Sequence, residues 1–348
     1  MKAQRSEQRA QQLEKTVLSY ADRGKAEVGT WLVSVARSDF LAQFFAQDAP
    51  EVTDCELTVI LNPGTGRLIL RYDFGADRVI YAKLFPDNLG AHSHQVNTAF
   101  RLAGFDDRSR FRVPEPLAYL PEHRLLWQRG VNGIQLGAAL AGRTDLDLIE
   151  GARAAAQWLV ALHRSSLRIG APTTFLDDFH VFRIFNKALK VAAIRPSRCD
   201  LLAELVSLWQ SRLQRVPHAA PVVQTHGRFR HEHVFISRDA VSVIDLDRSH
   251  PAHPATDAAE FVHALRWETF KSGGDLNRAD QAVQAFLDEY LAGVPEAEPG
   301  LTACWSSLIL VTLLRYLKRP HITTDERQRI IEFQTSEMKR IGNDHRQG

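Results

Sequence analysis

The sequence predicts an α+β protein of two lobes, in which a small antiparallel-sheet lobe precedes a larger helical lobe. The chain has 348 residues, whereas a single hydrophobic core usually stops growing at roughly 250 to 300 residues. Short runs of β-branched and aromatic residues fill residues 55–85, and apolar residues at helical spacing dominate from residue 150 onward. One β-like stretch, at residues 222–245, interrupts the helical part. Length and the change of period therefore favour two lobes.

The N-terminal part carries apolar residues at helical spacing in two blocks within residues 7–47. The two blocks are separated near Gly24 and Gly29, so we expect two amphipathic helices. Residues 1–50 are accordingly predicted to form an N-terminal helical segment that packs on the rest of the chain.

Residues 51–130 are predicted to form the sheet-rich lobe. The runs CELTVIL, RLILRYDF and RVIYAKLF predict three strands, joined into an antiparallel meander by the turns NPGTG and GAD. HSHQVNTAFRLAG then predicts a helix that ends at Gly104, because glycine commonly terminates helices. LLWQRGVNG predicts a further strand that leads into a glycine-containing connection, with a hinge near residues 127–133.

Residues 131–340 are predicted to form the helical lobe. Five segments have helical spacing: GARAAAQWLVALHRS, CDLLAELVSLWQSRL, PATDAAEFVHALRWETF, RADQAVQAFLDEYLAG and ACWSSLILVTLLRYLKR. The polar end NDHRQG is expected to fray. Ligands often bind where two such lobes meet, so the interlobe region is the expected place for a site.

Composition argues against several function classes. Lysine and arginine total 43 against 41 aspartate and glutamate, so no global field favours nucleic acid or an anionic membrane. Cys55, Cys199 and Cys304 are far apart, which argues against a disulfide framework or a thiolate zinc site. The N-terminus has no apolar signal region, and no apolar run of about 18 residues occurs. We therefore expect a cytoplasmic protein.

The stretch VVQTHGRFRHEHVFI…VSVIDLD reads as a strand, a polar loop and a hairpin that ends in two aspartates. A hairpin would place the loop after His226 beside Asp245 and Asp247, because paired strands bring their ends together. Mg²⁺ prefers carboxylate and amide oxygens, which makes Asp245 a candidate ligand. The alternative is that Asp245 is a turn residue that caps the hairpin, and the sequence leaves both open.

Residues 223–265 resemble the catalytic segment of the aminoglycoside phosphotransferase and choline kinase family. That segment reads H-G-D-x-x-x-x-N, then a hydrophobic hairpin ending I-D-x-D, then G-D-P-x-x-D-L. The residues on matching positions are His226, Gly227, Asp245, Asp247, Pro254 and Asp257. The resemblance implies the two-lobed protein-kinase-like fold, an ATP donor and Mg²⁺, with structural roles for His226 and Asp257. Asp257 could also serve as the N-cap of the helix that follows.

Other motifs extend the resemblance over residues 55–318. Lys83 in VIYAKLF matches the family's phosphate-contacting lysine on the third strand. LLWQRGVNGIQL resembles the family's hinge, so Gln128 and Gly130 are implied nucleotide contacts together with Lys83. LVALHRS resembles the helix that precedes the catalytic segment. Without the resemblance, Lys83 reads as a strand-edge lysine that faces water.

The departures from the family pattern lie at its chemical positions. Arg228 stands at the position of the catalytic aspartate, and His233 stands at that of the metal-binding asparagine. A guanidinium is always protonated, so Arg228 cannot accept a proton, but it could clamp phosphate or occupy the metal site with its own charge. A neutral imidazole at His233 suits a transition metal better than Mg²⁺. No glutamate follows in AHSHQVNTAF to pair with Lys83, and Gln95 is the nearest polar candidate.

The same region allows two other interpretations. Arg228 and Arg230 could simply be a solvated basic loop. The stretch also concentrates five histidines, and a strand would turn His231 and His233 to one face, as a zinc site requires. The spacing matches no zinc signature, however. The five are His226, His231, His233, His250 and His253.

Three functions follow from these observations. The first is a divergent ATP-dependent O-phosphotransferase acting on a small molecule, with Arg228 and Asp245 as catalytic residues and Asp245 and His233 as metal ligands. The second is a pseudokinase, a non-catalytic nucleotide- or metabolite-binding module that regulates a protein partner. The third is an adenylyl transferase. None of the three requires nucleic acid or a membrane, and the sequence does not identify the acceptor.

Overall fold

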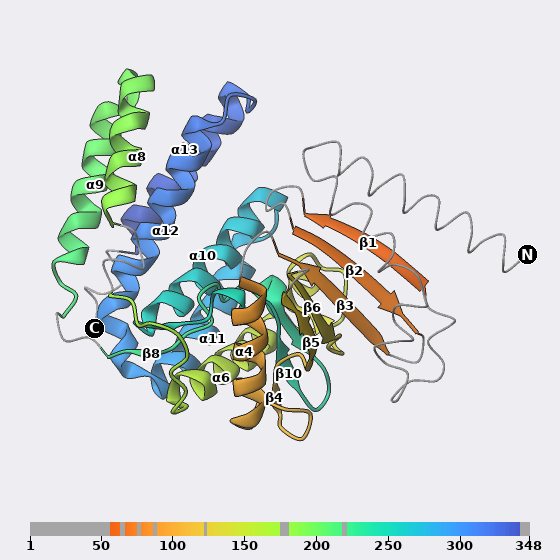
Figure 1. The fold of residues 1–348 in the computed structure, drawn as a ribbon. Helices are drawn as coiled ribbons and strands as arrows, with labels where there is room; N and C mark the ends of the chain where they lie inside the picture. The colour runs from red at the N-terminus through yellow and green to blue at the C-terminus, as the bar shows by residue number, and fades with distance from the viewer. Residues whose placement is uncertain are drawn as a thin grey trace, which may run out of the picture. The chain divides into compact units, whose positions relative to one another are not determined.

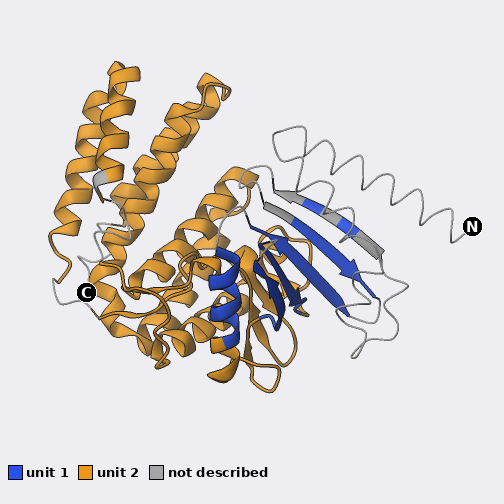
Figure 2. Ribbon diagram, in the orientation of Figure 1, with its two compact units in different colours: residues 1–98, 114–131 blue, residues 99–113, 132–348 orange. Residues whose placement is uncertain are grey.

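A computed structural model describes residues 56–62, 67–74, 78–85, 89–121, 124–174, 181–217 and 221–341 (Figure 1). The predicted segment 1–50, most of the two predicted hairpin turns and the end NDHRQG lie outside these residues. The chain divides into two compact units: unit 1 comprises residues 1–98 and 114–131, and unit 2 comprises residues 99–113 and 132–348 (Figure 2). The predicted α+β class is confirmed, because unit 1 contributes an antiparallel sheet and unit 2 is mostly helical.

The described part of unit 1 forms a five-stranded antiparallel sheet in the order β1-β2-β3-β6-β5. Its strands are β1 (Glu56–Asn62), β2 (Arg67–Asp73), β3 (Val79–Leu84), β5 (Pro116–Leu120) and β6 (Leu125–Arg129). The alternation in β2 buries Leu70 and Tyr72 on one face, and Tyr72 packs on Trp127 with ring centroids 5.2 Å apart. The three strands expected within residues 55–85 are confirmed.

Helix α4 (Leu89–Leu102) follows β3, and its chain continues from unit 1 into unit 2. Gly104 has a φ of 98°, and its amide donates to the carbonyl of Arg101. The helix therefore ends where the glycine in the sequence predicted.

Unit 2 places a small sheet beside its helices. Among the described residues this sheet has the order β4-β10-β9-β7, made of β4 (Phe111–Arg112), β7 (Ile134–Gln135), β9 (Val234–Ile236) and β10 (Val241–Val243). β9 and β10 form the expected antiparallel hairpin, and the amide of Ile244 donates to the carbonyl of His233 at 3.0 Å. Separately, β8 (Val223–Gln224) pairs with β11 (Pro251–Ala252). The β8–β11 pairing brings the two ends of the 222–257 stretch together, and the hairpin lies between them.

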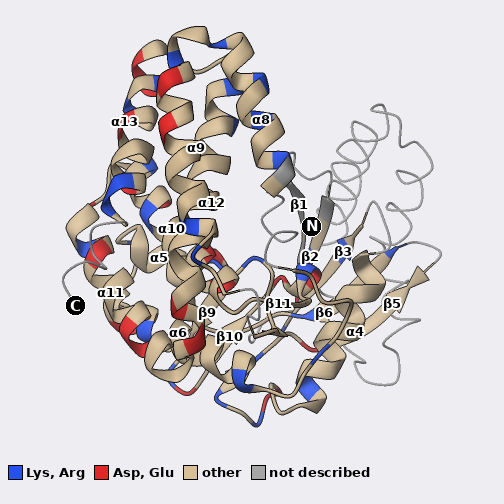
Figure 3. Cartoon of the chain, turned by 90° about the vertical axis from the view of Figure 1, so that its left-hand side faces the viewer, with Lys and Arg blue, Asp and Glu red and all other residues tan. Residues whose placement is uncertain are grey.

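The helical segments predicted in unit 2 are all present, and α5, α8 and α13 were not predicted. The helices are α5 (Leu136–Leu140), α6 (Leu148–Arg164), α8 (Val181–Ile194), α9 (Cys199–Leu213), α10 (Ala255–Ser272), α11 (Leu276–Gly293), α12 (Glu298–Lys318) and α13 (Thr324–Arg340). Basic and acidic residues are interspersed along these helices (Figure 3). Among the described residues, only the segment Pro295–Lys318 is long and apolar enough to cross a membrane. Its most apolar window is 72% buried inside the protein, as in a core helix.

An aromatic column in unit 2 holds the loop that follows β8. Phe229 of that loop is fully buried and stacks on Trp158 of α6 at 5.7 Å and on Phe261 of α10 at 5.5 Å. Phe261 stacks in turn on Phe286 of α11 at 4.2 Å. Buried aromatic side chains contribute large apolar areas, so this column fixes the middle of the loop against three helices.

Candidate functional site

Asp257, in the first turn of α10, anchors the loop after β8. Its carboxylate accepts hydrogen bonds from the backbone amides of His226 at 2.6 Å and Gly227 at 2.9 Å. It also lies 3.2 Å from Nε2 of His163, at the end of α6. Burial opposes ionisation of Asp257, but His163, His226 and the amide hydrogen bonds together hold its pKa below the ordinary value. The N-cap role considered for Asp257 is wrong, because the N-cap position is Pro254 and makes no side-chain capping bond.

The anchor continues to a third helix through buried polar groups. Nδ1 of His163 lies 2.8 Å from the hydroxyl of Tyr290 on α11, and that hydroxyl donates to the carbonyl of Pro254 at 3.0 Å. His163 and Tyr290 are both buried, so these bonds are shielded from water. The loop is therefore tied to α6, α10 and α11 through one carboxylate.

Gly227 and His226 shape the start of the loop. Gly227 has a φ of 78°, and a Cβ there would lie 2.1 Å from the carbonyl oxygen of Arg248. Only glycine permits this crossing of two backbone segments. Nε2 of His226 donates to the carbonyl of Ile244 at 2.9 Å, and Nδ1 accepts from the amide of Arg228 at 3.3 Å. His226 therefore bridges backbone groups, as expected for a structural histidine.

Arg228 is half-buried, and its backbone is well held. Its carbonyl lies 3.0 Å from Nδ1 of His233. Its guanidinium makes no hydrogen bond or ion pair with any residue that the structure describes, and hence none with Asp245. Its charge acts on Glu232. Burial alone would raise the pKa of Glu232, but Arg230, the neighbouring histidines and Arg228 lower it below the ordinary value.

His233 and Asp245 face each other across the hairpin. Nε2 of His233 lies 3.5 Å from Oδ2 of Asp245, and the His233 ring stacks on His226 at 5.6 Å. Burial, with the neighbouring His226, lowers the pKa of His233 to about 3, so its ring is neutral at pH 7. Asp245 has a φ of 70°, an uncommon backbone conformation for a residue other than glycine. Its side chain does not cap the 3₁₀ turn η4 (Leu246–Arg248), which argues against the turn-cap alternative.

The predicted nucleotide contacts lie in unit 1. Lys83 on β3 is 9% exposed and pairs with Leu126 of β6, so the water-facing alternative is wrong. Gln128 is buried within β6, and the amide of Gly130 donates to the carbonyl of Val79 at 2.6 Å. A site that joins these residues to Arg228 of unit 2 stays a prediction.

A family model described as "Phosphotransferase enzyme family" matches residues 64–299, more than half of the chain. The chain belongs to the phosphotransferase enzyme family. No curated protein matches the sequence.

Solved structures similar to this phosphotransferase family member share its fold. Plasmodium vivax ethanolamine kinase is 12% identical, with 87% of this chain and 88% of that chain covered and a TM-score of 0.53. Choline kinase from Cryptosporidium parvum is 9% identical, with coverages of 88% and 96% and a TM-score of 0.54. Aminoglycoside phosphotransferase APH(2'')-Ib, solved with ADP, is 11% identical, with coverages of 86% and 98% and a TM-score of 0.52. The expected kinase-like fold is confirmed.

The donors present in this family member fit Mg²⁺ poorly. Asp245 supplies a carboxylate oxygen, which suits the ion, but His233 supplies a nitrogen in place of an amide oxygen. The structure describes no group of three or more histidine, cysteine, aspartate and glutamate side chains that could hold a metal. The zinc-site alternative also loses its geometric basis, since residues His231–His233 form a 3₁₀ turn (η3) and not a strand.

Sequence reasoning missed the ion pairs beside the loop in this family member. Arg230 lies 2.8 Å from Glu232 and 3.0 Å from Glu260 of α10, so the solvated reading of Arg230 is wrong. Burial raises the pKa of Glu260 against the opposing charges of Arg230 and Arg228. Tyr290 was also missed. Neither Glu260 nor Tyr290 carries a local sequence signal, because each meets the loop from a helix distant in sequence.

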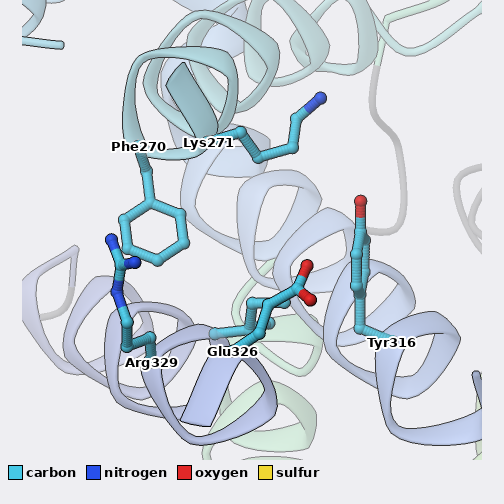
Figure 4. A pocket seen from close by; sticks show the side chains of 6 residues that line it. Phe270, Lys271, Tyr316, Glu326 and Arg329 are labelled. Carbon is cyan, nitrogen blue, oxygen red and sulfur yellow. The ribbon is translucent and has the colours of Figure 1, made fainter. Parts of the chain in front are cut away.

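A pocket of about 230 Å³ lies where α10 and α12 end and α13 begins (Figure 4). Arg329 lies over the ring of Phe270, at 5.8 Å from its centroid. The residues that line the pocket are Phe270, Lys271, Tyr316, Glu326, Arg329 and Ile330. None of the predicted site residues lines it.

Proposed function

We propose that this protein transfers the γ-phosphoryl group of ATP to a hydroxyl of a small molecule, with Arg228 as a phosphate contact. The observation that carries the proposal is the anchored loop, which presents a guanidinium without an ion-pair partner among the described residues. A planar guanidinium matches phosphate oxygens and forms strong charge-assisted hydrogen bonds with them. Family membership supplies the reaction class.

The reaction tolerates loss of the aspartate. Phosphoryl transfer has a loose transition state, and catalysis rests mainly on positioning and charge neutralisation. A general base contributes roughly 10² to 10⁴ in rate, so its replacement slows the reaction without abolishing it. The acceptor oxygen would bond to the γ-phosphorus as the bond from phosphorus to ADP breaks. The hydroxyl proton would pass to water, because Arg228 has no lone pair to accept it.

Two other residues are assigned supporting roles in this proposal. Lys83, buried on β3, is the proposed contact to the phosphates from unit 1. Asp245 is the proposed oxygen ligand of a divalent cation, and such a cation neutralises phosphate charge when it is bound. Gln128 and Gly130 remain candidate contacts to the nucleotide.

The second candidate function is a pseudokinase, a nucleotide-binding module without turnover. The cation of Arg228 favours it, because that side chain can hold an anionic ligand but cannot deprotonate an acceptor. The two candidates share the binding step and differ in whether the γ-phosphoryl group is lost.

Calorimetric titration with ATP and ADP, with and without divalent ions, tests the shared step. Arg228→Ala is expected to weaken ATP binding about 10- to 100-fold, the effect of losing a charge-assisted bond of roughly 1.5–3 kcal/mol. Arg238→Ala is the control, since Arg238 is an exposed arginine of the nearby hairpin turn. Absence of nucleotide binding would refute both functions, and equal effects of the two variants would refute the role of Arg228.

Labelled ATP then separates the candidates. Transfer of the γ-phosphate to a pool of hydroxylated small molecules supports the kinase, and Arg228→Asp is expected to raise that rate by restoring a carboxylate. Nucleotide binding without any transfer supports the pseudokinase. Transfer of the α-phosphate would identify an adenylyl transferase instead.

A further inference from the structure

The His233–Asp245 pair presents one nitrogen donor and one oxygen donor to the same point. A carbonyl oxygen only accepts hydrogen bonds, so Nδ1 of His233, 3.0 Å from the Arg228 carbonyl, must carry a proton. Nε2, the other ring nitrogen, faces Oδ2 of Asp245 at 3.5 Å. A ring nitrogen and a carboxylate oxygen that face each other at this distance form an arrangement that a bound cation stabilises.

The backbone and ring contacts hold this pair in place without a cation. His233 is 7% exposed, and its ring stacks on His226 with an interplanar angle of 11°. The amide of Ile244, the residue before Asp245, donates to the carbonyl of His233 at 3.0 Å. Both donors are thus supported by neighbouring groups, which is what an ordered ligand site requires.

The separation of the two donors discriminates between classes of ion. With metal–ligand distances of about 2.05 Å to nitrogen and 2.1 Å to oxygen, two donors 3.5 Å apart subtend roughly 115° at the metal. That angle is close to tetrahedral. Mg²⁺ requires near-octahedral geometry at about 2.1 Å, for which adjacent donors would lie about 3.0 Å apart.

Donor chemistry leads to the same class. Imidazole nitrogen suits zinc, copper, iron and nickel ions, whereas Mg²⁺ prefers carboxylate, carbonyl and water oxygens. The positive charge of Arg228 acts on this position. That charge repels every divalent ion alike, so it lowers affinity without changing the preference among them.

We propose that His233 and Asp245 bind a divalent transition-metal ion of the Zn²⁺ and Co²⁺ type in preference to Mg²⁺. The inference rests on the proposed function in one respect, that phosphate oxygens of the nucleotide, with water, complete the coordination. The protein would then be a phosphotransferase that prefers another class of metal ion, because His233 stands where the family pattern has asparagine.

Co²⁺ titration of the full-length protein, followed by visible absorption, tests the proposal with and without ADP. Tetrahedral Co²⁺ absorbs more strongly than octahedral Co²⁺, so the spectrum reports geometry directly. We expect Zn²⁺ to displace Co²⁺ at equal concentration, and Mg²⁺ to fail to displace it at a tenfold excess. His233→Asn is expected to weaken Co²⁺ binding about tenfold or more and to favour Mg²⁺. Asp245→Asn is expected to weaken binding of both ions.

His231→Asn is the matched control. His231 belongs to the same turn, and its Nε2 lies 3.6 Å from a carboxylate of Glu232, yet it stands outside the pair. Unchanged Co²⁺ binding in this variant supports the assignment. Displacement of Co²⁺ by equimolar Mg²⁺, an unchanged spectrum in His233→Asn, or no Co²⁺ binding with or without ADP would each overturn it.

Nucleotide binding, measured separately by calorimetry, distinguishes the two hypotheses. Co²⁺ binding at this pair without any nucleotide binding would support the metal inference and refute the proposed function. Mg²⁺-dependent ATP binding that is equal in wild type and His233→Asn would refute the metal inference and leave the proposed function standing.

Discussion

Two groups of residues within 226–257 differ in how they are held: a supporting side of His226, Gly227 and Asp257, and a chemical side of Arg228 and His233. On the supporting side, Asp257 accepts hydrogen bonds from the amides of His226 and Gly227, and both Asp257 and His226 are buried. On the chemical side, the Arg228 guanidinium has no hydrogen-bond or ion-pair partner among the described residues. The supporting side matches the family pattern at each of these positions, whereas the chemical side departs from it at Arg228 and His233. A change on the supporting side disturbs several buried partners, while a change at Arg228 disturbs few.

The largest expected loss of stability follows Asp257→Ala. The change removes the acceptor of two backbone amides, that of His226 buried, and the partner of His163, so the free energy of unfolding should fall by about 3–5 kcal/mol. Urea denaturation measures it. The control is Asp275→Ala, which removes an N-cap bond to the amide of Asn277 at the exposed start of α11 and should cost about 1 kcal/mol. Equal losses in the two variants would erase the distinction between the sides.

Gly227→Ala is expected to cost about 2–4 kcal/mol, the sum of left-handed backbone strain and overpacking. Its Cβ would meet the Arg248 carbonyl at 2.1 Å, so the two segments must separate. Gly273→Ala isolates the strain alone, because Gly273 has a φ of 69° and no atom within 4 Å of the added Cβ. That control should cost about 1–2 kcal/mol. A Gly227→Ala variant no less stable than the control would show that the crossing adapts freely.

The loss of stability in acid should distinguish Asp257 of the supporting side from His263, which is buried in α10. Burial lowers the pKa of His263 from 6.5 to about 3, so the unfolded state binds more protons between these values. The contribution of neutral His263 to the free energy of unfolding is full above pH 6.5. It falls as the pH drops, and the loss is about 2 kcal/mol at pH 5. The lowered pKa of Asp257 contributes above its ordinary value and is lost only at more acidic pH. Denaturation at pH 7 and pH 5 should show the loss of about 2 kcal/mol in the wild type and not in His263→Asn. An equal loss in both proteins would show that His263 is not its cause.

The smallest expected effect belongs to Arg228→Ala, which should change the free energy of unfolding by less than about 0.5 kcal/mol. Arg212→Ala provides the contrast within the same unit. Arg212 is buried, with its pKa lowered to about 10 by burial, and donates to the carbonyl of Met338 at 2.8 Å and the hydroxyl of Ser306 at 2.6 Å. Its loss should cost about 1–3 kcal/mol, because it leaves buried acceptors unsatisfied. If both arginines cost the same, Arg228 has a structural role and the comparison fails.

Local patterns in the sequence determined much of this protein. The alternation in RLILRYDF specified a strand that buries Leu70 and Tyr72, and the helical period specified the core helices of unit 2. The hairpin between VFI and VSV placed Asp245 beside His233. These features follow from the sequence because backbone geometry and hydrophobic period act over a few neighbouring residues.

Only the tertiary structure decided which polar groups meet. His163, Tyr290 and Asp257 come from three helices, and the burial of Lys83 depends on β6 packing beside β3. It likewise decided that His231 and His233 lie on a 3₁₀ turn and that Arg230 pairs with Glu260. Such contacts join residues distant in the chain, and their strength comes from removing water around them, so no local pattern specifies them.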